Sequence, residues 1–180
     1  MDQKGYVALA KDAIRAAFEQ TVLDKDHYTA KNPRLEDQGA AFVTLTEQGR
    51  LRGCIGSIIA HRSLYDDIVH NARSAAFRDP RFLPLAREEF QHVDVEVSLL
   101  TPPQEVLYAD RHELEHLVRP GIDGVILKLN GYQATFLPQV WEELNDFDSF
   151  FSHLGIKAGI GNNPLDHHPQ IFTYQVEKFS

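Results

Sequence analysis

The stretch AAFVTLTEQGRLRGCIGSII, residues 40–59, predicts the central feature of the fold. It contains two β-prone runs, 40–47 and 51–59, separated by Gln48-Gly49-Arg50. A glycine between two such runs takes the positive φ that a tight turn needs, so the stretch is typical of a β-hairpin. The sequence therefore indicates an antiparallel sheet with this hairpin in it.

Outward from the hairpin, apolar periodicity, capping signals and turn dipeptides predict the remaining elements. Asn130-Gly131 indicates a second hairpin, and Asp79-Pro80 ends the helix that Ser63 begins. We expect helices over 6–22, from Ser63 to Asp79, from Asp110 to Pro120 and over 139–154, strands over 92–100, 125–129, 132–137 and 171–179, and a loop over 24–39.

This order predicts an α+β fold with a mostly antiparallel sheet and flanking helices, because hairpins need no crossover connection. It also allows an internal duplication. The length of 180 residues predicts a single domain over residues 1–180. A content of 43% hydrophobic and 24% charged residues excludes a disordered chain.

Charge and cysteine content limit the class of protein. The net charge of −8 disfavours binding to nucleic acid, although Arg50, Arg52, Arg62, Arg73, Arg78 and Arg81 could form a local basic patch. The single cysteine, Cys54, cannot form an internal disulfide. The first five residues open no apolar signal region, and no run approaches the ~18 apolar residues of a membrane span, so we expect a cytoplasmic protein.

The segment LRGCIG, residues 51–56, contains the first candidate site. Alternation along a strand places Arg52, Cys54 and Gly56 on one face. A guanidinium beside a thiol favours the thiolate, and Gly53 and Gly56 let a ligand or another backbone approach closely. The alternative is a buried structural cysteine, with glycines that mark a bulge.

The strand over 92–100 presents Glu96 and Ser98 on its polar face. If the strands over 51–59 and 92–100 are neighbours or lie one strand apart, the face with Arg52 and Cys54 and the face with Glu96 and Ser98 are expected on the same side of one sheet. We then expect the Arg52 guanidinium to contact the Glu96 carboxylate, because such a pair would satisfy both charges. Asp79 is a candidate helix cap and Arg81 a candidate to bind an anion. The Arg52–Glu96 pair could equally serve only to set the strand register.

The segment HELEH, residues 112–116, matches the spacing of a zinc-binding helix. Glu113 already serves as the capping partner of Asp110, the helix is short, and no third ligand follows at a known offset. We therefore favour an exposed polar helix, and expect neither a metal nor a cofactor. Phe147, Phe150 and Phe151 fall at helical spacing and are expected in the core.

Five blocks of the sequence resemble the AMME chromosomal-region protein family, whose hallmark is the LRGCIG hexapeptide. The match covers about residues 39–179 and comprises LRGCIG at 51–56, AAF at 75–77 with DPRF at 79–82, EVS at 96–98, FLPQV at 136–140 and KAG at 157–159. Single-domain prokaryotic members are called protein A of the AmmeMemoRadiSam system. The resemblance implies an α+β fold with a larger and a smaller lobe, and signature residues gathered near a cleft. Residues 131–135 and 161–164 depart from the usual family pattern.

Three functions follow as hypotheses. The resemblance favours a binding or accessory component that works with Memo-like and radical SAM proteins. The alternative is a cysteine-dependent enzyme for a small anionic substrate, with Cys54 as nucleophile, Arg52 binding the anion and Glu96 orienting Arg52 or exchanging protons. A nucleic-acid-binding factor is the third. The candidate ligand-binding residues are Gly53, Gly56, Asp79, Arg81, Ser98, Gln139 and Lys157.

Overall fold

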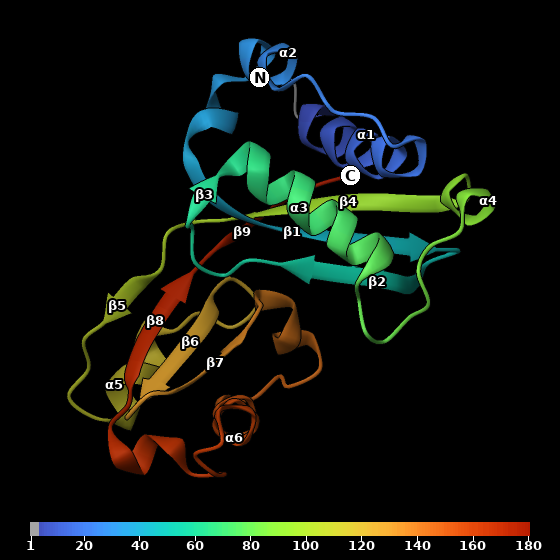
Figure 1. Ribbon diagram of the computed structural model, residues 1–180. Coiled ribbons are helices and arrows are strands. Elements are labelled where there is room, and N and C mark those ends of the chain that lie inside the picture. Colours follow the sequence, from blue (N-terminus) through green and yellow to red (C-terminus); the bar gives the residue numbers. More distant parts are fainter. Residues whose placement is uncertain (1–3) are drawn as a thin grey trace. The chain divides into compact units, whose positions relative to one another are not determined.

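Two antiparallel sheets organise residues 4–180, which are the residues that the computed structural model describes (Figure 1). Each sheet belongs to its own compact unit. The first unit runs to Leu100 and includes Glu177–Ser180, and the second unit is Thr101–Val176. The predicted α+β class with antiparallel pairing and a larger and a smaller lobe is confirmed.

The sheet of the first unit has the strand order β2-β1-β4-β9, and a short strand β3 also pairs with β1. Helices α1 and α3 pack on one face of this sheet (Figure 1). The elements of this unit are α1 (Lys4–Glu19), α2 (Lys25–Lys31), the 3-10 helix η1 (Pro33–Glu36), β1 (Gln38–Glu47), β2 (Arg50–Gly56), β3 (Arg62–Ser63), α3 (Leu64–Phe77), α4 (Arg87–Phe90), β4 (Val93–Leu100) and β9 (Val176–Phe179).

The core of the first unit lies between this sheet face and the two helices. Alternate residues of β1, including Val43 and Leu45, are fully buried against the apolar stripes of α1 and α3, including Leu9 and Ile68. Burial of such side chains is the main stabilising contribution in a fold of this size. The opposite face of β1 carries Thr44, which is partly exposed.

The sheet of the second unit has the strand order β5-β8-β6-β7. Its core contains Phe150 and Phe151 of α6, and the Trp141 ring stacks on Phe150 at 3.6 Å between centroids. The predicted core position of these phenylalanines is confirmed. The elements are β5 (Gln104–Val106), α5 (Arg111–Leu117), β6 (Gly124–Leu129), β7 (Tyr132–Phe136), η2 (Pro138–Glu142), α6 (Phe147–Ala158), η3 (Pro164–His167) and β8 (Gln170–Tyr174).

Turn glycines and helix-capping residues correctly predicted where several elements begin or turn. Gly49 and Gly131 take φ values of 75° and 85° in the two hairpin turns. The Ser63 hydroxyl accepts a hydrogen bond from the Asp66 N–H and caps α3, as the capping signal predicts. The Asp110 carboxylate likewise caps α5.

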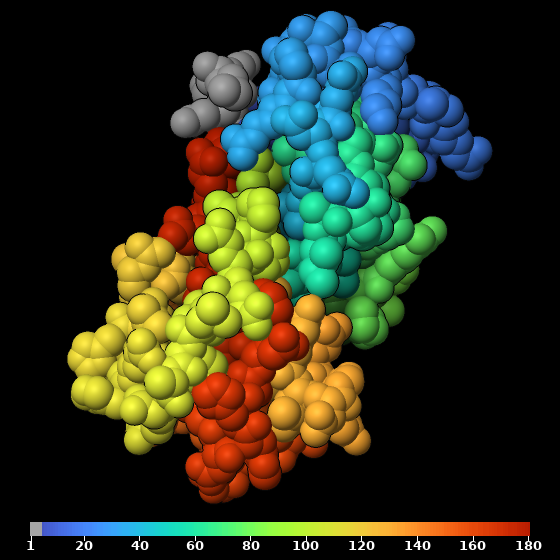
Figure 2. All heavy atoms as spheres, turned by 90° about the vertical axis from the view of Figure 1, so that its left-hand side faces the viewer, coloured from blue at the N-terminus to red at the C-terminus, as the bar shows by residue number. Residues whose placement is uncertain are grey.

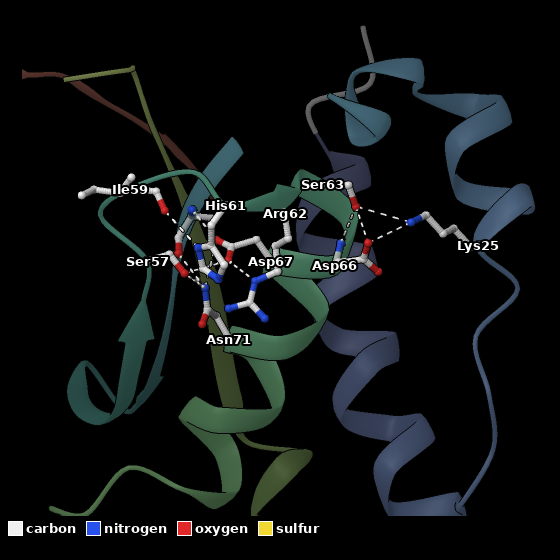
Figure 3. Close-up of polar contacts among 10 residues, drawn as sticks. Lys25, Ser57, Ile59, His61, Arg62, Ser63, Asp66, Asp67 and Asn71 are labelled. Carbon is white, nitrogen blue, oxygen red and sulfur yellow. Dashed lines mark hydrogen bonds and ion pairs between the residues drawn. The ribbon is translucent and has the colours of Figure 1, made fainter. Parts of the chain in front are cut away.

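The prediction of a structureless loop over 24–39 is wrong, because this segment contains α2 and η1. A helix of seven residues is too short to show an apolar period, and its position depends on tertiary contacts. The Tyr28 hydroxyl of α2 donates to Asp12 at 2.7 Å. The Lys25 ammonium, drawn in Figure 3, donates to Asp66 at 2.9 Å. The segment lies at the surface, in light blue in Figure 2.

Two further expectations are corrected at the C-terminal side. The predicted helix over 139–154 is divided into η2 and α6, because the Asp146 carboxylate accepts from the Ser149 N–H and starts α6 there. The predicted strand over 171–179 is divided into β8 and β9, which belong to different sheets.

No helix in residues 4–180 has the length and apolar character needed to cross a bilayer. The first three residues, on which the expectation of no signal peptide partly rests, lie outside the described range.

Candidate functional site

Strand β2 carries the LRGCIG segment at the edge of the first sheet. Its pairing with β1 is antiparallel, but the register shifts between Leu45 and Thr46, so that Gly53 faces Leu45 and Leu51 faces Thr46. Arg52 is therefore the extra residue of a β-bulge. A bulge interrupts the alternation of side chains and re-aims the extra one.

Past the bulge, alternation holds and brings part of the candidate site together. Cys54 and Glu96 both face Thr44 of the central strand β1, so the three side chains form one row on one face. Gly56 and Ser98 form the next row of that face, with Phe42 between them. The expectation that Cys54 and Glu96 share a face of one sheet is confirmed.

The expected contact between Arg52 and Glu96 is wrong. The Arg52 guanidinium instead donates from Nε and Nη2 to the two carboxylate oxygens of Glu89 in α4, each at 3.0 Å. Nη2 also donates to the Leu83 carbonyl at 3.0 Å. Glu96 has Lys178 of β9 as its ion-pair partner, at 3.6 Å. The bulge, which sequence alternation does not reveal, is the physical reason.

This Arg52–Glu89 pair is bidentate and largely withdrawn from water, with 13% of the Arg52 side chain exposed. The hydrogen bonds from Arg52 hold the pKa of Glu89 below its usual range, and Glu89 in turn raises the pKa of Arg52. The Phe82 ring lies 5.8 Å from the guanidinium. Through Nε and Nη2, Arg52 thus holds the chain around α4.

Asp79 and Arg81 hold the outer edge of β2 at Cys54. The Asp79 carboxylate, 4% exposed, accepts from the Cys54 N–H at 2.9 Å, and Arg81 Nη2 donates to the Cys54 carbonyl at 3.3 Å. Arg81 also donates to Asp79 from Nη2 at 2.7 Å and from Nε at 3.0 Å. These hydrogen bonds, chiefly those from the Arg81 side chain, hold the pKa of Asp79 well below its usual range. Side chains thus replace a neighbouring strand at this edge.

The Cys54 thiol is partly exposed, and its Sγ lies 3.2 Å from Thr44 Oγ1. Arg81 interacts electrostatically with Cys54, but this is the smallest contribution to the raised pKa of Arg81, and the hydrogen bond to Asp79 is the largest. The hydrogen bonds of Arg52 and Arg81 go to carboxylates and backbone carbonyls. The two arginines nearest to Cys54 in the signature blocks, Arg52 and Arg81, are thus each paired with a carboxylate.

Close packing explains both glycines of the segment. A Cβ on Gly53 would lie 2.2 Å from the carbonyl oxygen of Ala75 near the end of α3. A Cβ on Gly56 would lie 2.1 Å from the ring of Phe42. The expected close approach of another backbone is thus made by α3 of the same chain.

A second polar cluster, centred on Asp67 of α3, holds the chain after β2 (Figure 3). Sequence reasoning did not identify it. The fully buried Asp67 of α3 accepts from the Ser57 hydroxyl at 2.7 Å, from Arg62 Nε at 2.8 Å and from the Ala41 N–H at 2.8 Å. Asn71, one turn later, donates to Asp67 at 3.1 Å and to Ser57 at 3.2 Å. Asp67 and Asn71 lie four positions apart, next to the apolar stripe of α3. This spacing is the signal that could have revealed the cluster.

The remaining candidates belong to the second unit. Gln139 lies in η2 and is exposed. Lys157 donates to the Thr135 carbonyl at 2.9 Å, its ammonium lies 5.0 Å from the Phe136 ring centroid, and partial burial lowers its pKa. These contacts place Lys157 on α6 beside β7.

The HELEH segment forms α5, with His112 and His116 exposed and their ring centroids 4.5 Å apart. The Glu113 carboxylate accepts from the Ala109 N–H, so it serves the start of the helix. Within residues 4–180, no three histidine, cysteine or acidic side chains are grouped so that they could hold a metal ion.

Comparison with known proteins agrees with this fold. The AMMECR1 family model matches residues 7–179. A protein of Sulfolobus acidocaldarius is 38% identical over 163 residues, covering 87% of this chain and 71% of the relative. A protein of Methanothermobacter thermautotrophicus is 33% identical, covering 97% of each chain.

A solved structure is also similar. The crystal structure of an uncharacterized protein from Pyrococcus horikoshii superposes with a TM-score of 0.82 at 31% identity, covering 96% of this chain and 88% of that one. The family model covers both units, and residues 51–56 lie within the match. The chain therefore belongs to the AMMECR1 family.

Proposed function

We propose that this protein is a binding or accessory component, and that the segment between α3 and α4, residues 78–86, presents a fixed apolar surface to a partner protein. We call this segment the connector. The observation that carries the proposal is Leu83, whose side chain is 84% exposed although the backbone around it is held on both sides.

The contacts of the connector support this proposal. Before Leu83, Asp79 bonds to the Cys54 N–H, and at Leu83 itself the carbonyl accepts from Arg52. After it, the Leu85 N–H donates to the Ala76 carbonyl at 2.8 Å, and the Leu85 side chain is buried. An exposed leucine on a mobile loop is ordinary, whereas one on a held loop loses little entropy when a partner covers it.

The surroundings of Cys54 favour binding over catalysis at this site. Arg52 and Arg81, the two cations that could activate the thiol, are both bound to carboxylates. Of the candidate residues, Arg52, Gly53, Asp79 and Arg81 each have a structural contact with α3, the connector or α4. A cysteine-dependent enzyme needs groups that accept the thiol proton and stabilise the thiolate, and a carboxylate bound to each arginine makes both less available for that role.

The family resemblance suggests Memo-like and radical SAM proteins as the partners. We further propose that residues 1–180 act as one domain, since the family model spans both units and β9 completes the first sheet after the chain has left the second unit. A cytoplasmic location is part of the same proposal, based on the single cysteine and the absence of a long apolar run.

Titration calorimetry with purified Memo-like protein, and separately with purified radical SAM protein, tests the proposal. We expect Leu83→Asp to weaken binding to at least one of them by about tenfold or more, because a charge at an apolar contact is costly. Leu107→Asp is the control, since Leu107 is 79% exposed and lies in the second unit. Cys54→Ala should bind like the wild type. Equal binding by Leu83→Asp and wild type, or no binding by either partner, would overturn the proposal.

Iodoacetamide labelling of the native protein against pH separates this proposal from the enzyme alternative. If Cys54 is not an activated nucleophile, it should label no faster in the native protein than in the urea-unfolded protein at the same pH. Rapid labelling of Cys54 below about pH 7 would instead favour a thiolate and contradict the non-catalytic role.

A further inference from the structure

An open depression between α1, α4 and the start of β4 lies outside the site described above. Its volume is about 410 Å³, which falls within the range of ~300–1,000 Å³ for small-molecule sites. All of its lining residues belong to the first unit. They are Lys11, Arg15, Phe18, Glu19, Arg87, Phe90, Gln91 and Val93.

The inner part of the depression is apolar and held by ring contacts. The Phe18 ring lies 5.9 Å from the Phe90 ring and 5.1 Å from the Phe77 ring, the latter edge to face. Val93, at the first position of β4, is buried. Phe18 and Phe90 are each partly exposed, so the apolar portion of a ligand could contact both rings.

Cations predominate among the charged lining residues, although the chain as a whole carries a net charge of −8. Arg15 forms an ion pair with Asp12, and Glu19 is the one carboxylate in the lining. The ion pairs found among the described side chains include neither Lys11 nor Arg87. The Arg87 guanidinium lies 5.9 Å from the Phe18 ring centroid, over the apolar part of the depression.

Two available cations beside an aromatic floor are complementary to one class of ligand. We propose that this depression binds a small organic anion, whose carboxylate or phosphate group pairs with Lys11 and Arg87 and whose apolar portion packs on Phe18 and Phe90. Guanidinium and ammonium groups bind such oxygens through charge-assisted hydrogen bonds. The inference goes beyond the proposed function, because none of the connector residues, 78–86, lines the depression.

Titration of the ¹⁵N-labelled full chain with three matched probes tests this site. The probes are phenyl phosphate, benzoate and the neutral benzyl alcohol. We expect saturable shifts of the amide signals of residues 11–19 and 87–93 with at least one of the two anions, and none of comparable affinity with the alcohol. Tighter binding of phenyl phosphate would identify a phosphate as the preferred group, and tighter binding of benzoate a carboxylate.

Charge-removing variants complete the test. Lys11→Gln and Arg87→Gln should each weaken binding of the preferred anion by about tenfold, because each removes one charge-assisted contact. Arg34→Gln, at an exposed arginine of η1, is the matched control and should bind like the wild type. Unchanged binding by both Lys11→Gln and Arg87→Gln, equal binding of the alcohol, or shifts confined to other residues would overturn the proposal. Leu83→Asp should leave anion binding unchanged, so the two proposals can fail separately.

Discussion

The Asp79 carboxylate accepts a hydrogen bond from the backbone N–H of Cys54 at 2.9 Å, across 25 residues of sequence. Cys54 lies on an edge strand, where the outward N–H would otherwise need water or another strand. Because Asp79 also binds Arg81, one buried carboxylate joins the signature strand to the connector. The stability of the first unit should therefore depend on residues of this small polar cluster.

Asp79→Asn should lower the free energy of unfolding by about 1–3 kcal/mol, because it removes the charge that Arg81 and the Cys54 N–H both bind. The expected loss is below that of a fully buried pair, since 54% of the Arg81 side chain is exposed and solvent screens it. Urea unfolding measures the effect. Asp148→Asn is the control, because Asp148 pairs with Arg111 at an exposed position and should change stability by less than about 0.5 kcal/mol.

The same carboxylate predicts a pH dependence. The folded-state pKa of Asp79 is lowered, so its contribution is present above the unfolded-state pKa of about 3.9 and is lost as the pH falls toward the folded-state pKa. The difference in unfolding free energy between wild type and Asp79→Asn should therefore shrink below about pH 4. Urea unfolding at a series of pH values measures it. A difference that stays constant down to about pH 2 would contradict this assignment.

Gly53→Ala should destabilise the protein by at least about 2 kcal/mol, because the new Cβ would meet the Ala75 carbonyl, a backbone atom that cannot rotate away. Gly5→Ala is a control of opposite sign. Gly5 lies in α1, and nothing lies within 4 Å of the position that a Cβ would take there, so alanine should raise stability by a few tenths to about 1 kcal/mol. Thermal unfolding of both variants compares them, and equal effects would show that the Ala75 contact is unimportant.

Arg52→Lys keeps the charge but cannot reproduce the bidentate contact with Glu89 together with the bond to the Leu83 carbonyl. The connector should therefore exchange its amide hydrogens faster, while strands β6 and β8 of the second unit should not change. Hydrogen exchange followed by mass spectrometry of peptides over 78–90, 124–129 and 170–174 measures this. Identical exchange of the connector in both proteins would show that Arg52 does not hold it.

Asp67→Asn tests the polar cluster centred on Asp67, and Asp66→Asn at the adjacent residue is the control. Asp67 is fully buried and bonded to Arg62, whereas the adjacent Asp66 has a half-exposed side chain. Replacement of Asp67 should cost about 3 kcal/mol, because Arg62 and the Ala41 N–H lose a buried acceptor charge. Asp66→Asn should cost less than about 1 kcal/mol. Equal losses in urea unfolding would contradict the importance of this cluster.

Local signals predicted most of the fold. The turn at Gly49, the cap at Ser63 and the Asn130-Gly131 hairpin each depend on residues within a few positions of one another, so the sequence alone reveals them. Helix α2 was missed because seven residues give no measurable period. The strand predicted over 171–179 was divided because periodicity reports that a segment is extended, not which sheet it joins.

The candidate site was predicted only in part. Alternation correctly placed Cys54 and Glu96 on one face, since both strands flank β1. Alternation gave the wrong partner for Arg52, because Arg52 is the extra residue of a bulge and the regular alternation of side chains does not hold there. Glu89 and Asn71 were not singled out, as no local pattern marks a polar residue that meets a distant strand.

The sequence by itself determined the α+β class, the family, the hairpins and the helix caps, because these follow from interactions between near neighbours in the chain. Only the tertiary structure decided that Arg52 binds Glu89 and that Asp79 binds the Cys54 N–H, 37 and 25 residues away. Such contacts depend on the strand register and on where α3 ends against the sheet. They form when packing brings distant segments together, and that packing is set by the whole core.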